Sequence, residues 1–234
     1  KGTDNDERLG PKRILQSELI SRAQLRQAIF VISAVAVLLT ILLVYTAFGL
    51  SNTALTFLGL GFLAIVAAIR YTVGSSAYGY MGFGDLFVFL FFGCVSVLGS
   101  HYLYTYEFDL SLIFPAISIG LFSVGVLNIN NMRDRVNDKK YGKTTIAVRL
   151  GAKKAALYQL ALVGIPVILT VVYGLIYHAI SFVVMSLIII IPISLHLKVV
   201  FQKQNEKNLD LELKKIALLT FFYAISFSLL LIVF

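Results

Sequence analysis

The sequence predicts an all-α protein built as a polytopic transmembrane helical bundle. Hydrophobic residues make up 59% of the 234 positions, charged residues only 14%, and the mean hydropathy is +0.88. A soluble domain of this length cannot bury so much apolar surface. Several apolar runs reach the ~20 residues that a helix needs to cross a bilayer. These runs are too long for barrel strands, and backbone polar groups in lipid must be satisfied internally, so helices remain as the spanning elements.

Seven such runs follow one another along the chain. They cover roughly residues 27–49, 52–70, 85–106, 110–130, 154–177, 179–201 and 213–234. Pro115, Pro166 and Pro192 fall within these spans, where neighbouring helices can absorb a kink. We therefore expect seven spans, joined by minimal loops on one side and longer polar loops on the other.

The basic residues are confined to one side of this topology. If the spans alternate in direction, segments 1–26, 70–84, 131–153 and 198–215 share a side, and all 20 Lys and Arg lie there or at adjoining helix ends. The opposite loops hold no Lys or Arg, and one of them carries Glu107 and Asp109. By the positive-inside rule, the basic side is cytoplasmic.

The net charge of +8 does not indicate a nucleic-acid partner. No soluble domain is available to present a basic face, and basic loops set topology and attract anionic lipid headgroups. We expect contact with membrane lipid and no binding of nucleic acid. Cys94 is the one cysteine, so it forms no internal disulfide and is expected to be a small packing residue.

A polar segment between the fourth and fifth spans carries the clearest chemistry. In this segment, NNMRDRVNDKKYGKTTIAVR, Asn130, Asp134 and Asp138 recur every fourth residue, so a helix would place them on one face. Basic residues, Lys140 and Lys143 among them, surround this triplet. Carboxylate and amide oxygens suit Mg2+, which shares its ligands with substrate phosphates. A solvated charged loop is the alternative, but ionisable clusters at a membrane surface are functional by default.

A second candidate segment, YTVGSSAYGYMGFGD, joins the second and third spans on the same side. It carries four glycines and three tyrosines, and it ends at Asp85, which leads into the apolar run LFVFLFFG. Glycine lets the backbone approach a ligand closely, and tyrosine offers a ring and a hydroxyl. An interfacial tyrosine belt with flexible turns would have the same composition. The three histidines, His101, His178 and His196, show no paired ligand pattern and are expected to be packed or interfacial.

The residues of these segments resemble a known family. The pattern NxxxDxxxD at Asn130, Asp134 and Asp138, continued by GKTTIAVRLG, resembles the second aspartate-rich motif of the UbiA superfamily of intramembrane prenyltransferases. The opening KGTDNDERLGPKRILQSELIS is similar to the end of that family's first aspartate-rich motif and the basic loop after it. Together with GYMGFGDLFVFLFFG, it looks like the branch that prenylates 1,4-dihydroxy-2-naphthoate. The resemblance covers essentially the whole chain.

The resemblance implies a fold of nine transmembrane helices around a central cavity open to the cytoplasm. The seven spans of this chain would match the last seven. Residues 1–234 would then form a single prenyltransferase transmembrane domain that is incomplete at its N-terminus. The protein would be integral to a bacterial cell membrane, with its active site on the cytoplasmic side.

The resemblance also implies a reaction. A polyprenyl group would pass from polyprenyl diphosphate to 1,4-dihydroxy-2-naphthoate, with release of diphosphate and CO2, forming demethylmenaquinol in menaquinone biosynthesis. The expected metal ligands for Mg2+ are Asn130, Asp134, Asp138 and Asp4; the diphosphate-binding residues are Lys143, Arg8, Arg13 and Lys140; the catalytic residues are Asp85, Tyr80 and Tyr78.

Two alternatives remain open on the sequence. A sister prenyltransferase acting on 4-hydroxybenzoate, homogentisate or a tetrapyrrole would share the aspartate-rich motifs. An ion-coupled membrane transporter could use an acidic cluster as its ion site. A transporter predicts charged or broken helices deep in the bilayer, whereas the acidic residues of this chain cluster at helix ends.

Overall fold

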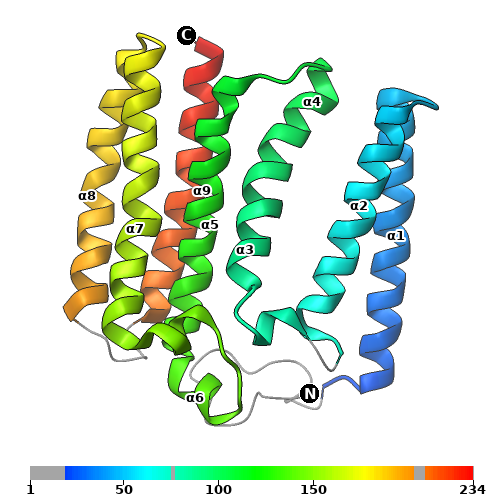
Figure 1. Ribbon diagram of the computed structural model, residues 1–234, viewed down its shortest axis with the longest axis horizontal. Coiled ribbons are helices and arrows are strands. Elements are labelled where there is room, and N and C mark those ends of the chain that lie inside the picture. The colour runs from blue at the N-terminus through cyan, green and yellow to red at the C-terminus, as the bar shows by residue number, and fades with distance from the viewer. Residues whose placement is uncertain (1–18, 75–76, 203–208, 234) are drawn as a thin grey trace. The chain divides into compact units, whose positions relative to one another are not determined.

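The computed structural model describes residues 19–74, 77–202 and 209–233, and every regular element in these ranges is helical (Figure 1). Seven helical segments in this part of the chain are long and apolar enough to cross a membrane: Arg22–Phe48, Asn52–Thr72, Gly84–Thr105, Leu110–Arg133, Ile146–Ile176, Ile180–Gln202 and Leu209–Val233. The predicted all-α fold with seven spans is confirmed. The chain divides into two compact units, Lys1–Tyr80 and Met81–Phe234.

The first unit contains a helical hairpin. Its elements are α1 (Arg22–Phe48), α2 (Asn52–Thr72) and the short 3-10 helix η1 (Tyr78–Tyr80). α1 begins at Arg22 because Ser21 caps it: the Ser21 hydroxyl accepts from the Gln24 amide, and the Gln24 side chain accepts from the Ser21 amide. This capping box starts the first span about one turn earlier than its apolar run predicts.

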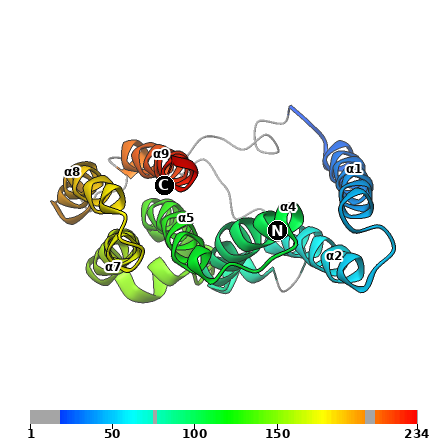
Figure 2. The same ribbon diagram turned by 90° about the horizontal axis from the view of Figure 1, so that it is seen from above.

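The second unit contains the other five spans. Its elements are α3 (Gly84–Val88), the π-helix η2 (Phe89–Gly99), α4 (Ser100–Thr105), the 3-10 helix η3 (Leu110–Leu112), α5 (Ile113–Arg133), α6 (Arg135–Lys140), α7 (Ile146–Ile176), α8 (Ile180–Gln202) and α9 (Leu209–Val233). Four of these helices close into a ring, because α5 packs against α7 and α9, and α8 packs against the same two helices (Figure 2).

Aromatic side chains fill the interior of this four-helix ring. The Tyr173 ring of α7 lies 4.7 Å from Phe182 of α8 and 5.2 Å from Phe227 of α9, measured between centroids. The outward face of α8 is equally apolar, with Leu187, Ile188 and Ile191 all more than half exposed. Apolar surfaces on both sides of a helix are typical of a membrane span that faces lipid.

The third predicted span is one continuous path of three helical segments, α3, η2 and α4, and it packs against α5. The contact is close at Gly93 of the π-helix. A Cβ atom there would lie 2.6 Å from the Ala116 carbonyl oxygen and 2.6 Å from the Gly120 Cα. Glycine is therefore required at this crossing, as at many close helix contacts in membranes.

α7 differs most from its predicted boundaries. It begins at Ile146, rather than near residue 154, because the Thr145 hydroxyl accepts from the Val148 amide and caps the helix. Gly151, with φ of 73°, then kinks the path before the apolar run. The polar GKTT segment is thus joined directly to the span, and it contacts α6, where the Lys143 amide donates to the Asp138 carbonyl.

Candidate active site

The acidic triplet lies where α5 ends and α6 begins. α5 ends at Arg133, and Asp134 is the residue between the two helices. The helical hydrogen bonding nevertheless continues, because the Asp134 amide donates to the Asn130 carbonyl at 3.1 Å and the Asp138 amide to the Asp134 carbonyl at 2.8 Å. The predicted one-turn spacing of Asn130, Asp134 and Asp138 therefore survives the break between the helices.

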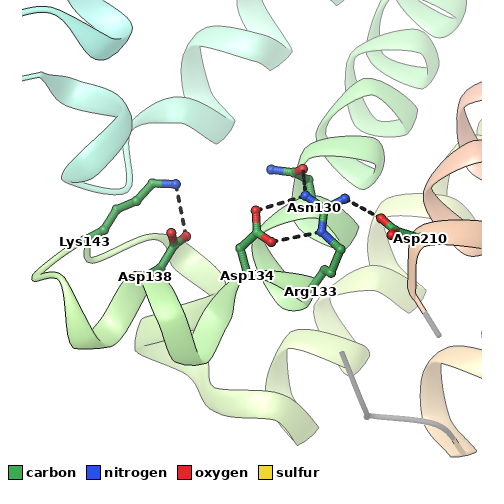
Figure 3. Close-up of polar contacts among 6 residues, drawn as sticks. All are labelled: Asn130, Arg133, Asp134, Asp138, Lys143 and Asp210. Carbon is green, nitrogen blue, oxygen red and sulfur yellow. Dashed lines mark hydrogen bonds and ion pairs between the residues drawn. The ribbon is translucent and has the colours of Figure 1, made fainter. Parts of the chain in front are cut away.

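Arg133 joins three of the polar side chains at this point (Figure 3). It donates to Asp134 from Nε at 2.9 Å to Oδ1 and from Nη2 at 3.0 Å to Oδ2. Nη2 also donates to Asn130 Oδ1 at 2.8 Å. The Arg133 side chain is only 2% exposed and that of Asp134 only 4%. A buried bidentate pair of this kind holds the carboxylate plane in one orientation.

The fourth hydrogen bond of the Arg133 guanidinium is donated to a residue of α9. Nη1 donates to Asp210 Oδ1 at 2.6 Å, and the Asp210 side chain is 49% exposed. The end of α5 is therefore tied to the first turn of α9. From the sequence, Arg133 is one of several basic residues around the triplet and Asp210 carries no prediction. Neither spacing nor composition distinguishes them, since the contact joins residues 77 positions apart.

A second ion pair lies one turn further on. Lys143 Nζ lies 3.0 Å from Asp138 Oδ2, with side chains 15% and 7% exposed. The turn between α6 and α7 sets this pair, because the Lys143 amide also donates to the Asp138 carbonyl at 2.9 Å. Lys140, the other predicted diphosphate ligand of this segment, is exposed and lies over the Tyr141 ring at 5.8 Å.

The donor set fits Mg2+, the cofactor that the resemblance implies. Asp134 and Asp138 are buried carboxylates one helical turn apart, and Asn130 adds an amide oxygen. Mg2+ is usually held by one or two carboxylates together with substrate phosphates. Among the residues that the structure describes, no group of three or more His, Cys, Asp or Glu side chains gathers around one point. Asp4, Arg8 and Arg13 lie outside the described residues.

Asp85 is held from a neighbouring helix. It lies in the first turn of α3, is 8% exposed, and accepts a hydrogen bond from the Tyr158 hydroxyl of α7 at 3.1 Å. Tyr158 carries no prediction from the sequence, where it is one polar group in an apolar span. The contact gives Asp85 a fixed orientation in the second unit.

The tyrosines predicted to act in catalysis belong to the first unit. The Tyr78 hydroxyl donates to the Ala67 carbonyl of α2 at 2.8 Å, and burial raises the pKa of Tyr78 above its ordinary value. The Tyr80 amide donates to the Ala77 carbonyl at 3.0 Å. The structure therefore brings Asn130, Asp134, Asp138 and Lys143 together in the second unit. Tyr78 and Tyr80 belong to the first unit, where their hydrogen bonds lie.

Arg149 joins two loop segments of the second unit. Its guanidinium donates from Nη2 to the Met81 carbonyl at 2.6 Å and from Nε to the Thr144 carbonyl at 3.1 Å. The first contact lies just before α3 and the second just before α7. Asp85 and Lys143 each lie within four residues of one of these anchors, so Arg149 ties together the backbone segments that carry them.

The fold and site define a polytopic helical membrane protein with paired acidic and basic side chains at one end of a four-helix ring. The chain belongs to the UbiA prenyltransferase family, whose sequence model matches residues 2–231. The family assignment from the sequence motifs is confirmed, and with it membership of a class of enzymes that transfer prenyl groups.

Similar proteins carry a common name. The chain is 38% identical to 1,4-dihydroxy-2-naphthoate octaprenyltransferase of Haemophilus influenzae over 98% of its own length and 74% of the relative. It is 42% identical to the protein of that name in Escherichia coli over 69% of its own length and 53% of the relative. The corresponding values for Mycobacterium tuberculosis are 38%, 70% and 55%. The chain thus spans about half of the latter two relatives. No solved structure matches the chain.

Proposed function

We propose that the protein of this chain transfers a polyprenyl group from polyprenyl diphosphate to 1,4-dihydroxy-2-naphthoate in a Mg2+-dependent reaction of menaquinone biosynthesis. Diphosphate and CO2 are the other products. The names of three bacterial relatives support this choice of acceptor. The observation that carries the proposal is the pair of buried carboxylates, Asp134 and Asp138, each held by a basic side chain at the end of an apolar bundle.

The residues of this cluster bind the donor. When bound, Mg2+ supplies electrophilic neutralisation of the diphosphate oxygens. Asp134 and Asp138, with Asn130, hold the metal, and Lys143 and Lys140 offer positive charge to the diphosphate as it leaves. Arg133 orients Asp134 and Asn130 through the bonds described above. Asp4 is proposed as a further metal ligand, and Arg8 and Arg13 as further diphosphate-binding residues; all three lie outside the described residues.

The chemical step is a substitution at carbon. The C–O bond of the allylic diphosphate breaks, and the diphosphate leaves with the bonding electrons. The ring carbon of the naphthoate that bears the carboxylate forms the new C–C bond with the allylic carbon. The electron pair of the ring–carboxylate bond returns to the ring as CO2 departs, so no oxidant is needed in this step. The apolar helices exclude water, which would otherwise capture the allylic cation.

Asp85 is proposed to orient the acceptor. It is a buried carboxylate whose position is set by Tyr158, and it begins the span that packs on α5. A carboxylate is an acceptor for the phenolic hydroxyls of a dihydroxynaphthoate. Tyr78 and Tyr80 are proposed as further catalytic residues, because an aromatic face stabilises positive charge.

The acidic cluster is proposed to face the cytoplasm of a bacterial cell. The support is the confinement of all 20 Lys and Arg to one side of the topology. A single cysteine introduced at Lys139, in a Cys94→Ser background, should react with a membrane-impermeant maleimide only in inside-out vesicles. Labelling in right-side-out vesicles would reverse the orientation.

The function is tested on the full-length protein in membranes. Prenylated product is measured with polyprenyl diphosphate, Mg2+ and each acceptor in turn: 1,4-dihydroxy-2-naphthoate, 4-hydroxybenzoate and homogentisate. Product should form with the naphthoate, Asp134→Ala should abolish it, and Asp109→Ala, on the opposite side, should leave it unchanged. Product with another acceptor alone would refute the substrate, and turnover by Asp134→Ala would refute the metal assignment.

A further inference from the structure

A chain of buried polar side chains crosses the four-helix ring. Each helix contributes one member: Asn128 from α5, Gln159 from α7, His196 from α8 and Glu212 from α9. The donor–acceptor distances are 2.9 Å from Asn128 to Gln159, 3.1 Å from Gln159 to His196 and 2.7 Å from His196 to Glu212. All four residues are at most 2% exposed. Polar side chains so deeply buried in a membrane bundle require a role.

A backbone carbonyl sets the direction of this chain. Asn128 Nδ2 donates to the Ala155 carbonyl at 3.2 Å as well as to Gln159 Oε1. A flip of the Asn128 side-chain amide would place its oxygen against these two acceptor oxygens, so the orientation is fixed. Gln159 then presents its Nε2–H to His196 Nε2, which must accept. His196 is therefore the neutral tautomer with its proton on Nδ1, and that proton is donated to Glu212 Oε2.

This hydrogen-bonded series of side chains ends beside the acidic cluster, which consists of Asn130, Asp134 and Asp138. Glu212 and Asp210 both lie in the first turn of α9, and Asp210 is the α9 partner of Arg133. The second oxygen of Glu212, Oε1, accepts from Lys215 at 2.6 Å. The first turn of α9 is thus held at two points, through Asp210 to the end of α5 and through Glu212 to α8.

Apolar packing alone leaves the rotation of α9 weakly specified. Its buried side chains, Ile216 and Phe227 among them, are no more apolar than Leu218 and Phe222, which are 47% and 60% exposed. Lipid tails are as apolar as these side chains, so turning the helix changes the apolar contacts little. A buried polar contact distinguishes one rotation from the others, because every other rotation leaves Glu212 or His196 without its partner.

We propose that Asn128, Gln159, His196 and Glu212 are positioning residues of the acidic cluster. They hold α9 at the depth and rotation at which Asp210 meets Arg133, and so keep Arg133 on Asp134 and Asn130. The inference rests on the proposed function, since it makes the network a support for the metal and diphosphate site. None of the four residues needs to touch substrate.

The first test measures Mn2+ binding in the presence of inorganic pyrophosphate, by electron paramagnetic resonance of the full-length protein in lipid nanodiscs. Glu212→Leu and Gln159→Leu should each raise the Kd for Mn2+ about tenfold, the usual effect of removing a group that orients a metal ligand. Glu212→Gln keeps an acceptor for His196 and should restore the affinity. Ser186→Ala is the matched control, because this buried α8 hydroxyl donates to the Phe182 carbonyl of its own helix. Equal affinities in Gln159→Leu and Ser186→Ala would overturn the proposal.

The second test needs no substitution in the network. In NMR spectra of protein labelled with 15N histidine, His196 should show a protonated Nδ1 and an unprotonated Nε2. The His101→Gln and His178→Gln variants identify which signals belong to His196. An imidazolium, or a proton on Nε2, would overturn the network even if Glu212→Leu fails to fold. An unsubstituted protein that shows the expected tautomer but binds no Mn2+ with pyrophosphate would refute the proposed function instead.

Discussion

Arg133 donates two parallel hydrogen bonds to its neighbour Asp134, from Nε to Oδ1 and from Nη2 to Oδ2, while both side chains are buried. The same guanidinium holds Asn130 from α5 and Asp210 from α9. One arginine therefore sets the geometry of two predicted metal ligands and ties two helices together. This arrangement gives the site a centre that its acidic residues alone do not reveal.

Two replacements of Arg133 should differ in their effect: Arg133→Lys should weaken substrate binding, and Arg133→Leu should also lower stability. Arg133→Lys keeps the charge but loses the bidentate geometry, so the apparent KM for polyprenyl diphosphate should rise about tenfold, equivalent to roughly 1.4 kcal/mol. Arg133→Leu removes the buried bidentate partner of Asp134 and the link to Asp210, an expected loss of about 3–5 kcal/mol of stability. Thermal unfolding and steady-state kinetics check both, with exposed Lys139→Arg as the control. Wild-type kinetics in Arg133→Lys would contradict the role of the bidentate pair.

Loss of the Tyr158 hydroxyl should affect one substrate only. Tyr158→Phe removes the 3.1 Å bond to Asp85 and leaves the acidic cluster intact. The KM for the naphthoate should rise about fivefold, as expected for one hydrogen bond of roughly 1 kcal/mol. The KM for polyprenyl diphosphate should stay within twofold of its original value on the same reasoning. A change confined to the KM for polyprenyl diphosphate would indicate that Asp85 acts on the prenyl donor instead.

A methyl group at the crossing of η2 and α5 should destabilise the second unit. In Gly93→Ala, the new Cβ would approach the Ala116 carbonyl and the Gly120 Cα at 2.6 Å, and backbone atoms cannot give way as a flexible side chain does. The expected loss is about 1–3 kcal/mol, typical of overpacking. Gly164→Ala is the control, because a Cβ there meets nothing within 4 Å. Equal melting temperatures for the two variants would contradict the close contact.

Tyr78 should make stability fall at alkaline pH. Burial raises its folded-state pKa above the ordinary value of 10.0, so the unfolded chain loses its proton first as the pH rises. The stabilisation is complete below pH 10.0 and is lost as the pH rises toward the folded pKa. Tyr78→Phe also leaves the Ala67 carbonyl without this donor, so it should be less stable at pH 8 by about 1 kcal/mol.

The difference in stability between Tyr78→Phe and the unsubstituted protein should therefore become smaller above pH 10.0. Melting temperatures between about pH 8 and pH 11 measure it, bracketing the ordinary tyrosine pKa. Tyr104→Phe is the control, because it removes the hydroxyl of a tyrosine that is 85% exposed. A constant difference across this range would show that Tyr78 does not titrate with folding.

Much of the fold follows from local pattern. Each apolar run is long enough to span a bilayer, and lipid permits a single spanning segment little besides a helix, so element type and order were predictable. The ends of α1 and α7 were not, because Ser21 and Thr145 cap them outside the apolar runs. The interruption of the third span by a π-helix also leaves no sign in composition.

Residue type and local spacing were enough to predict the seven helices, a topology with its basic residues on one side, and the one-turn spacing of Asn130, Asp134 and Asp138. These are properties of residue type and of position along one segment. The packed helices were needed to reveal that Arg133 reaches Asp210, that Tyr158 holds Asp85 and that His196 lies between Gln159 and Glu212. Such contacts join helices far apart in the chain, where apolar packing leaves rotation open and buried hydrogen bonds select one arrangement.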